Sequence, residues 1–153
     1  MDQEQYMKAL QSLEIQQKYI ENYQGQLGAM DSEIKQLNTA KETIQAYQGL
    51  SSGDDILVPV GSGFFVFGKI AQPGKVISGV GGGISVQESS GKAHKRLEER
   101  LEGLEKMRTR VREQLTSLEQ QYRGLARQVE AQYAKMNQGG PGSAGPESQA
   151  PGE

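Results

Sequence analysis

Hydrophobic residues recur at alternating spacings of three and four near both ends of the chain. Near the N-terminus the two interleaved sets are Tyr6, Leu13, Ile20, Leu27 and Ile34, and Ala9, Gln16, Tyr23, Met30, Leu37 and Ile44. Near the C-terminus they are His94, Leu101, Arg108, Leu115, Tyr122, Val129 and Met136, and Leu97, Leu104, Val111, Leu118, Leu125 and Gln132. This is the heptad pattern of a coiled coil, so the sequence predicts two long helices with one apolar seam each.

The two predicted helices are nearly equal in length and are separated by residues 51–90. This arrangement favours an antiparallel hairpin over a parallel dimer. Antiparallel pairing places an a position of one helix beside a d position of the other. In one register Leu27 pairs with Val111 and Leu13 with Leu125, and both helices then end together. We therefore expect these pairs to form within one chain.

The segment between the helices has the pattern of short strands. Four β-branched or aromatic runs, at residues 55–60, 64–70, 75–80 and 84–88, are separated by Gly61-Ser62-Gly63, Pro73-Gly74 and Gly81-Gly82-Gly83. This predicts two β-hairpins. Isolated hairpins are marginal in water, so apolar hairpins without a covering domain indicate burial against other subunits. The residues expected at that interface are Ile56, Val58, Val60, Phe65, Phe67, Val76 and Val80.

Composition divides the chain into four parts and sets the fold class. We expect an N-terminal coiled-coil helix at 1–50, a double β-hairpin oligomerisation segment at 51–90, and a C-terminal coiled-coil helix at 91–137. Residues 138–153 read QGGPGSAGPESQAPGE, which offers nothing to bury and predicts a disordered tail. Only 35% of the chain is hydrophobic and 6% aromatic, which suits a narrow stripe better than a compact core. The predicted fold is mainly α with a small β part.

Charge and cysteine content narrow the partners and the compartment. The net charge of −2 gives little support for nucleic acid or an acidic membrane as a main partner. The chain has no cysteine, which excludes a disulfide framework and fits a reducing compartment. The N-terminus lacks the basic flank and apolar core of a signal peptide, and no apolar run is long enough to span a bilayer. We therefore expect a soluble cytoplasmic protein.

Three short motifs between the two helices resemble a known family. Leu57-Val58-Pro59-Val60, Val66-Phe67-Gly68-Lys69 and Val80-Gly81-Gly82-Gly83 are similar to the alpha-type subunits of prefoldin. That type has two linker hairpins where the beta type has one. The resemblance covers about residues 1–136, and the Gly-rich turn and Gly/Pro tail are more typical of archaeal members. Phe67 is a departure, because many relatives have Pro before the Gly-Lys.

The resemblance implies an assembly and an activity. The assembly is a hexamer of two alpha-type and four beta-type subunits, in which the hairpins build a double β-barrel platform. The activity is that of an ATP-independent chaperone (holdase) that binds unfolded proteins and delivers them to a group II chaperonin. The alternative is a purely structural coiled-coil tether that oligomerises through its hairpins. The double-hairpin segment favours the chaperone, because a tether needs no such platform.

The ends of the two helices are the candidate contact sites for unfolded clients. The apolar residues there are Tyr6, Met7, Leu10, Val129, Tyr133 and Met136. Met7, Leu10 and Tyr133 lie beside the seam and stay partly exposed if the helices splay. Methionine is flexible and polarizable, which suits promiscuous apolar contacts. Ordinary frayed coiled-coil ends would look the same, and it is the family resemblance that favours client binding.

Enzymatic interpretations find little support in the sequence. Gly63, Gly68 and Lys69 have the spacing of a phosphate-binding P-loop, but Ile70 replaces the Ser or Thr that binds Mg²⁺. His94 is the only histidine, which makes a His-based metal site or catalytic triad improbable. The acidic run Glu98, Glu99, Glu102 and Glu105 is interpreted as a solvated helix face. We expect no catalytic residue, no metal and no cofactor.

Overall fold

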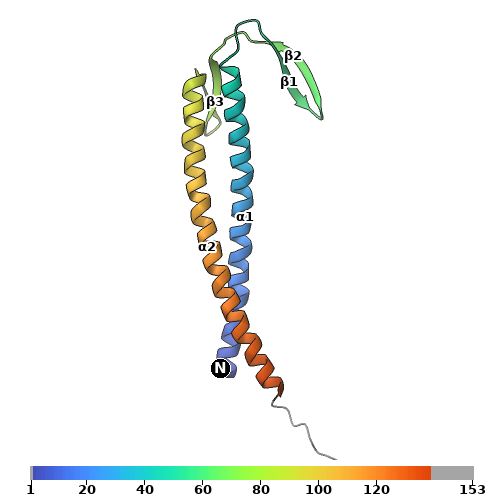
Figure 1. The fold of residues 1–153 in the computed structure, drawn as a ribbon, viewed down its shortest axis with the longest axis vertical. Coiled ribbons are helices and arrows are strands. Elements are labelled where there is room, and N and C mark those ends of the chain that lie inside the picture. Colours follow the sequence, from blue (N-terminus) through green and yellow to red (C-terminus); the bar gives the residue numbers. More distant parts are fainter. Residues whose placement is uncertain (1, 139–153) are drawn as a thin grey trace, which may run out of the picture. The chain divides into compact units, whose positions relative to one another are not determined.

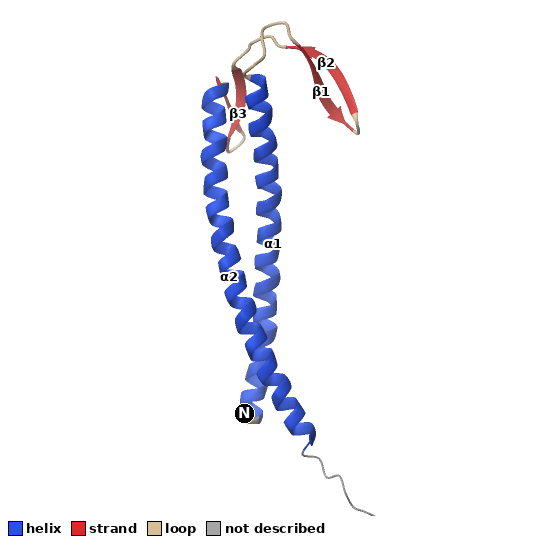
Figure 2. Ribbon diagram, in the orientation of Figure 1, coloured by secondary structure: helices blue, strands red, loops and turns tan. Residues whose placement is uncertain are grey.

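Two long helices flank four short strands in a computed structural model, which describes residues 2–138 (Figure 1). The elements are α1 (Gln3–Tyr47), β1 (Asp55–Gly61), β2 (Phe64–Lys69), β3 (Lys75–Gly81), β4 (Ile84–Ser89) and α2 (Ser90–Gln138). Helix accounts for most of these residues, and the strands form two separate antiparallel pairs (Figure 2). The predicted fold class is confirmed. The tail prediction lies, apart from Gln138, outside the described residues.

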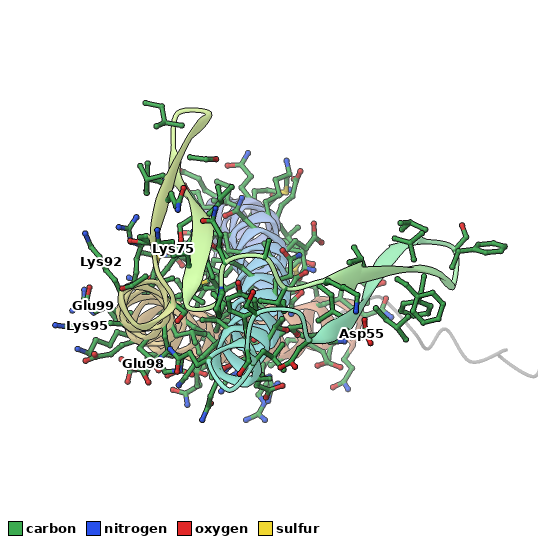
Figure 3. All side chains as sticks on the ribbon, turned by 90° about the horizontal axis from the view of Figure 1, so that it is seen from above. Asp55, Lys75, Lys92, Lys95, Glu98 and Glu99 are labelled. Atoms are coloured by element: carbon green, nitrogen blue, oxygen red, sulfur yellow. The ribbon has the colours of Figure 1, made fainter. Side chains whose placement is uncertain are left out.

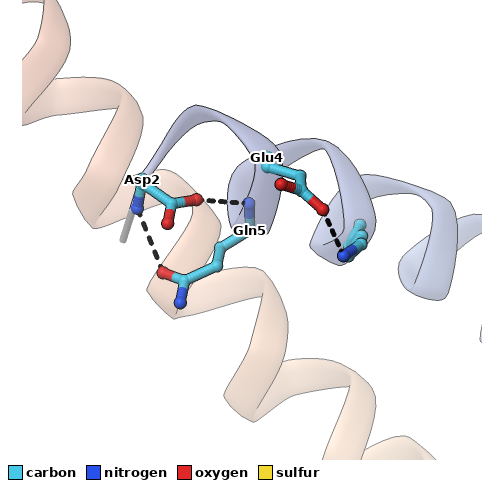
Figure 4. Close-up of polar contacts among 4 residues, drawn as sticks. Asp2, Glu4 and Gln5 are labelled. Carbon is cyan, nitrogen blue, oxygen red and sulfur yellow. Dashed lines mark hydrogen bonds and ion pairs between the residues drawn. The ribbon is translucent and has the colours of Figure 1, made fainter.

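The described residues form two compact units, residues 2–22 with 114–138 and residues 23–113. In the first unit, α1 begins with a reciprocal cap (Figure 4). The Gln5 backbone N–H donates to Asp2 Oδ1 at 2.7 Å, and the Asp2 N–H donates to Gln5 Oε1 at 3.0 Å. Each bond satisfies a backbone donor that would otherwise lack a partner, and the Glu4 carboxylate of the same turn pairs with Lys8. This cap fixes where the helix starts.

The heptad prediction agrees with the burial of every seam residue but one. Ala9, Ile20, Leu115 and Val129 are buried in the first unit, and the other predicted seam residues are buried or half-buried. Met136 is the exception, with 52% of its surface exposed. The predicted register would place it opposite the cap residue Asp2, where α1 has no apolar side chain to offer. The seam therefore ends before α2 does.

In the second unit, α1 and α2 are joined by ion pairs that fit the predicted antiparallel register. Arg108 Nε lies 2.6 Å from Asp31 Oδ1, and Lys41 Nζ lies 3.2 Å from Glu98 Oε1. In the register that places Leu27 opposite Val111, the two partners of each ion pair are displaced from each other by one residue. A third pair, Glu33 with Arg100, is offset further because the arginine side chain reaches along the helix. The structure thus supports the intrachain antiparallel pairing in this unit.

The two β-hairpins have the same backbone design, repeated 20 positions apart. β1 pairs with β2 from Asp55 opposite Lys69, and β3 pairs with β4 from Lys75 opposite Ser89. Both ladders shift register at the same place, between Pro59 and Gly61 and between Gly79 and Gly81. Both turns have three successive positive-φ residues, at 61–63 and 81–83. In the first turn the middle residue is Ser62 at φ 49°, a left-handed conformation that costs a non-glycine residue about 1 kcal/mol.

Arg108 puts a charge inside the seam, and its replacement provides a test of register control. A polar residue at an a position specifies register at a cost in stability. We expect Arg108→Leu to raise the thermal midpoint of the coiled coil, and Asp31→Ala to lower its stability by about 1 kcal/mol by leaving the guanidinium without its partner. Circular dichroism melting measures both. The exposed pair Glu102 and Lys106 supplies the control, because Glu102→Gln should change the midpoint little. A lower midpoint for Arg108→Leu would show that the charge itself stabilises the fold.

Candidate interaction surfaces

The β1–β2 hairpin exposes large apolar side chains on both faces. Residues opposite one another in an antiparallel ladder share a face. Val58 opposite Val66 therefore marks one face, and Phe65 opposite Pro59 marks the other. Exposed apolar residues on the hairpin are Leu57, Val58, Val60, Phe64, Phe65, Val66 and Phe67, of which Phe67 is 89% exposed. A two-stranded sheet has no core of its own, and residues 2–138 leave these side chains of the hairpin without apolar cover.

The predicted interface residues divide between these two faces. Ile56 and Val58 share a face with Gly68. The Ile56 side chain packs over this glycine, since a Cβ added to Gly68 would lie 3.4 Å from Ile56 Cγ1. Phe65 and Phe67 belong to the opposite face. Strand alternation predicted which residues of each strand share a face, but it did not relate the faces of the two strands to each other. The one-residue shift after Pro59 decides that relation, and it leaves Val60 at the irregular position.

The β3–β4 hairpin is less apolar and one of its faces is largely covered. Val76, opposite Glu88, is half-buried, and so are Ser78 and its opposite residue Val86. The reverse face has Ile77 opposite Gln87, with Ile77 77% exposed. Val80, at the register shift, and Ile84 are also exposed. This hairpin therefore offers a smaller apolar surface than β1–β2.

Polar contacts attach the β3–β4 hairpin and its approach to the helix ends. Arg96 of α2 donates to Glu88 Oε2 at 2.9 Å, and the Glu88 side chain is 4% exposed. The Tyr47 hydroxyl at the end of α1 donates to the Gln72 carbonyl at 2.7 Å, and Ser90 N–H donates to the Gly74 carbonyl at 2.8 Å. These contacts fix the hairpin where α2 begins.

The helix ends place four of the six candidate client residues at the surface. Met7 is 53% and Tyr133 60% exposed, and Leu10 and Met136 are exposed as well. Tyr6 is half-buried, and Val129 is buried in the seam with 8% of its surface exposed. The end of this unit thus has buried seam residues and, beside them, exposed apolar side chains.

Within residues 2–138, the charged side chains at the start of α2 and in the P-loop-like segment lie at the surface. Figure 3 shows Lys92, Lys95, Glu98 and Glu99 projecting from the first turns of α2, and the whole acidic run to Glu105 is exposed as predicted. A hydrogen bond and the positive charge of Lys106 lower the pKa of the fully exposed Glu102. The P-loop-like residues Gly68 and Lys69 lie in β2, and Lys69 pairs with Asp55 at 2.7 Å. This segment is a strand, as predicted, and does not form a phosphate-binding loop.

Within residues 2–138 no cluster of three or more His, Cys, Asp or Glu side chains is arranged to hold a metal ion. Neither of the described helices has a stretch long and apolar enough to cross a bilayer.

Sequence reasoning missed several surface residues. Ile15 and Tyr19 are more than half exposed on α1 and lie outside both predicted seam sets. Their spacing of four residues, off the heptad seam, was a signal that the sequence did contain. The ion pair between the buried Glu88 and the half-exposed Arg96 had no comparable signal, because two charged residues eight positions apart across a strand-to-helix junction follow no periodic rule.

The described fold defines a class of protein: two helices that pair through a heptad seam and present exposed β-hairpins between them. The family model described as Prefoldin subunit matches residues 16–135. The chain therefore belongs to the prefoldin family, a family of chaperone subunits. Its two hairpins and its relatives, mostly archaeal, place it with the alpha-type subunits.

Individual relatives agree with this assignment. The chain is similar to proteins named prefoldin subunit alpha from Methanococcoides burtonii (31% identical, 73% of this chain and 80% of the relative) and Methanospirillum hungatei (29%, 80% and 83%). The match to the Methanopyrus kandleri protein of that name, at 30% identity, spans about half of either chain, 56% and 55%.

Two solved structures resemble the fold. Filamentous prefoldin from Methanocaldococcus jannaschii has a TM-score of 0.62 at 27% identity, covering 78% of this chain and 96% of that one. The prefoldin beta subunit from Thermococcus strain KS-1 has a TM-score of 0.56, covering 83% of this chain and 90% of that one. At 19% identity the second likeness concerns the fold alone.

Proposed function

We propose that this chain is a subunit of an ATP-independent holdase that assembles through its hairpins and holds unfolded proteins at its helix ends. The observation that carries the proposal is the β1–β2 hairpin, which is apolar and exposed on both faces. Large exposed apolar patches mark interaction sites. The partners we propose are beta-type prefoldin subunits, in a hexamer of two alpha and four beta chains.

The helix ends suit weak and unselective binding. Met7, Leu10, Tyr133 and Met136 are exposed around a closed seam, and none of them is charged. An unfolded protein exposes apolar segments of many sequences, and flexible side chains can pack against any of them. Because the described groups show no catalytic arrangement, we propose that the chain holds its clients without chemistry and passes them to a group II chaperonin.

Aggregation of a denatured protein tests the proposal. We expect the chain, assembled with its beta-type partner, to suppress light scattering by a diluted, chemically denatured client, with no change when ATP is added. Subsequent addition of a group II chaperonin with ATP should restore folded client. A stable assembly that leaves aggregation unchanged would instead identify the structural tether. The family likeness to filamentous prefoldin makes the chain alone a useful second sample, because sizing it shows whether the beta-type partner is needed.

A further inference from the structure

Tyr19 and Ile15 form an apolar ridge on the flank of α1, within the unit of residues 2–22 and 114–138. Ile15 is 55% and Tyr19 59% exposed, and side chains four residues apart on a helix lie next to each other. With Lys18 and Asn22 they line a shallow hollow of about 370 Å³. The seam residues Leu13, Gln16 and Ile20 are buried or half-buried. The helices therefore pair through these residues, and Ile15 and Tyr19 are not needed for the pairing.

We propose that this ridge is a second client-binding surface, which takes an extended apolar segment of an unfolded protein. The inference rests on the proposed holdase function and adds a site on the flank of the helix to the one at its end. The ridge lies on the same row of α1 side chains as an exposed residue of the helix end. Met7, at 53% exposure, lies two steps of four residues before Ile15 on the same i, i+4 row.

The size of the ridge argues for a transient occupant. One isoleucine and one tyrosine, each half exposed, offer on the order of 200 Å² of contact, whereas a stable subunit interface buries about 800 Å² on each partner. A permanent neighbouring subunit would need a larger apolar surface than this. A short client segment needs no more, because contacts repeated on several subunits add up in effective affinity.

The charges beside the ridge favour a partner without a particular charge. Lys18 pairs with Glu14 at 3.3 Å, and Glu21 accepts a hydrogen bond from the Gln17 side chain at 3.0 Å. Positive and negative groups are thus interspersed, which selects neither acidic nor basic segments. The tyrosine hydroxyl adds a hydrogen-bonding group that can meet an exposed client backbone.

Photo-crosslinking in the full assembly tests the location. A benzophenone amino acid replaces Tyr19 in one sample and Glu21 in a control, which lies about 200° further around the helix. With a labelled, chemically denatured client we expect crosslinks from position 19 to the client, at least about threefold more than from position 21. Crosslinks from position 19 to another subunit, equal yields at the two positions, or no client crosslink would each overturn the inference.

A variant tests the contribution to holding. We expect the double substitution Ile15→Gln and Tyr19→Gln to raise the chaperone concentration for half-maximal suppression of aggregation by about three- to tenfold, with the helical circular dichroism signal and the assembly size unchanged. Met107→Gln is the matched control, because Met107 is 54% exposed on α2 in the other unit and lies outside the ridge. If the unmodified assembly protects the client and the double variant protects it equally, the ridge is not a client site while the holdase function stands. If the unmodified assembly does not protect, both are wrong.

Discussion

Placing a carboxylate on the β1–β2 hairpin is expected to abolish assembly. Phe65→Asp and Val58→Asp each remove an exposed apolar side chain that we assign to subunit contacts. Losing a buried Phe costs about 1.5–3 kcal/mol, and burying an unpaired carboxylate costs several kcal/mol more. A total of at least about 4 kcal/mol corresponds to an approximately thousandfold weaker interface. Analytical ultracentrifugation should show the subunits apart at concentrations where the unmodified chain is fully assembled.

The two substitutions report on different faces of the hairpin. Phe65 shares its face with Leu57 and Phe67, whereas Val58 shares its face with Val66. If both variants dissociate, both faces are covered in the assembly. If one of them assembles normally, its face is not part of the interface. Phe65→Leu is the matched control and should assemble, and circular dichroism should show nearly unchanged helix in all three. Normal assembly of both charged variants would refute the role of this hairpin.

Removing the helix ends is expected to eliminate most of the client holding while the assembly persists. The shortened chain covers residues 11–128 and lacks Tyr6, Met7, Leu10, Val129, Tyr133 and Met136. The seam from Leu13 to Ile44 against Leu97 to Leu125 remains, and the hairpins are unchanged. Because several helix ends act together on one client, we expect the concentration for half-maximal protection to rise more than about tenfold. Light scattering during client dilution measures this.

Two controls separate binding from loss of the coiled coil. Val129 is buried in the seam, so truncation removes packing as well as surface. A variant with Met7, Leu10, Tyr133 and Met136 all changed to Gln keeps Val129 in the seam and should lose protection to a similar extent. A chain lacking only residues 138–153 should protect normally, because the apolar side chains of that sequence are only those of alanine and proline. Full protection by the shortened chain would move client holding to the helix flanks or the hairpins.

The parts of the fold that follow a period were predictable from the sequence. Every residue that the heptads placed in the seam is buried or half-buried except Met136, and Gly-rich turns placed all four strands to within about one residue at each end. Met136 was predicted wrongly as a seam residue because its spacing continues the heptad beyond the start of α1. Periodicity describes one helix at a time and does not show where the partner helix ends.

Features that depend on three-dimensional neighbours could not be predicted in the same way. Which face of β1 goes with which face of β2 is set by a one-residue shift after Pro59. The β3–β4 hairpin is attached by the ion pair between Glu88 and Arg96, which is a contact between a strand and the next helix. Exposure of Leu57, Phe64 and Ile77 depends on what the rest of the chain leaves uncovered. The sequence therefore did not identify every exposed apolar residue of the two hairpins.

The two hairpins share their backbone geometry but not their side chains. Residues 55–69 and 75–89 have the same pairing, the same irregularity before Gly61 and Gly81, and left-handed turns of equal length. What differs is the side chains, with Phe64, Phe65 and Phe67 in the first hairpin and Ile84, Ser85 and Gln87 at the matching positions of the second. The two hairpins thus display one backbone geometry with two chemically different surfaces, one aromatic and one more polar.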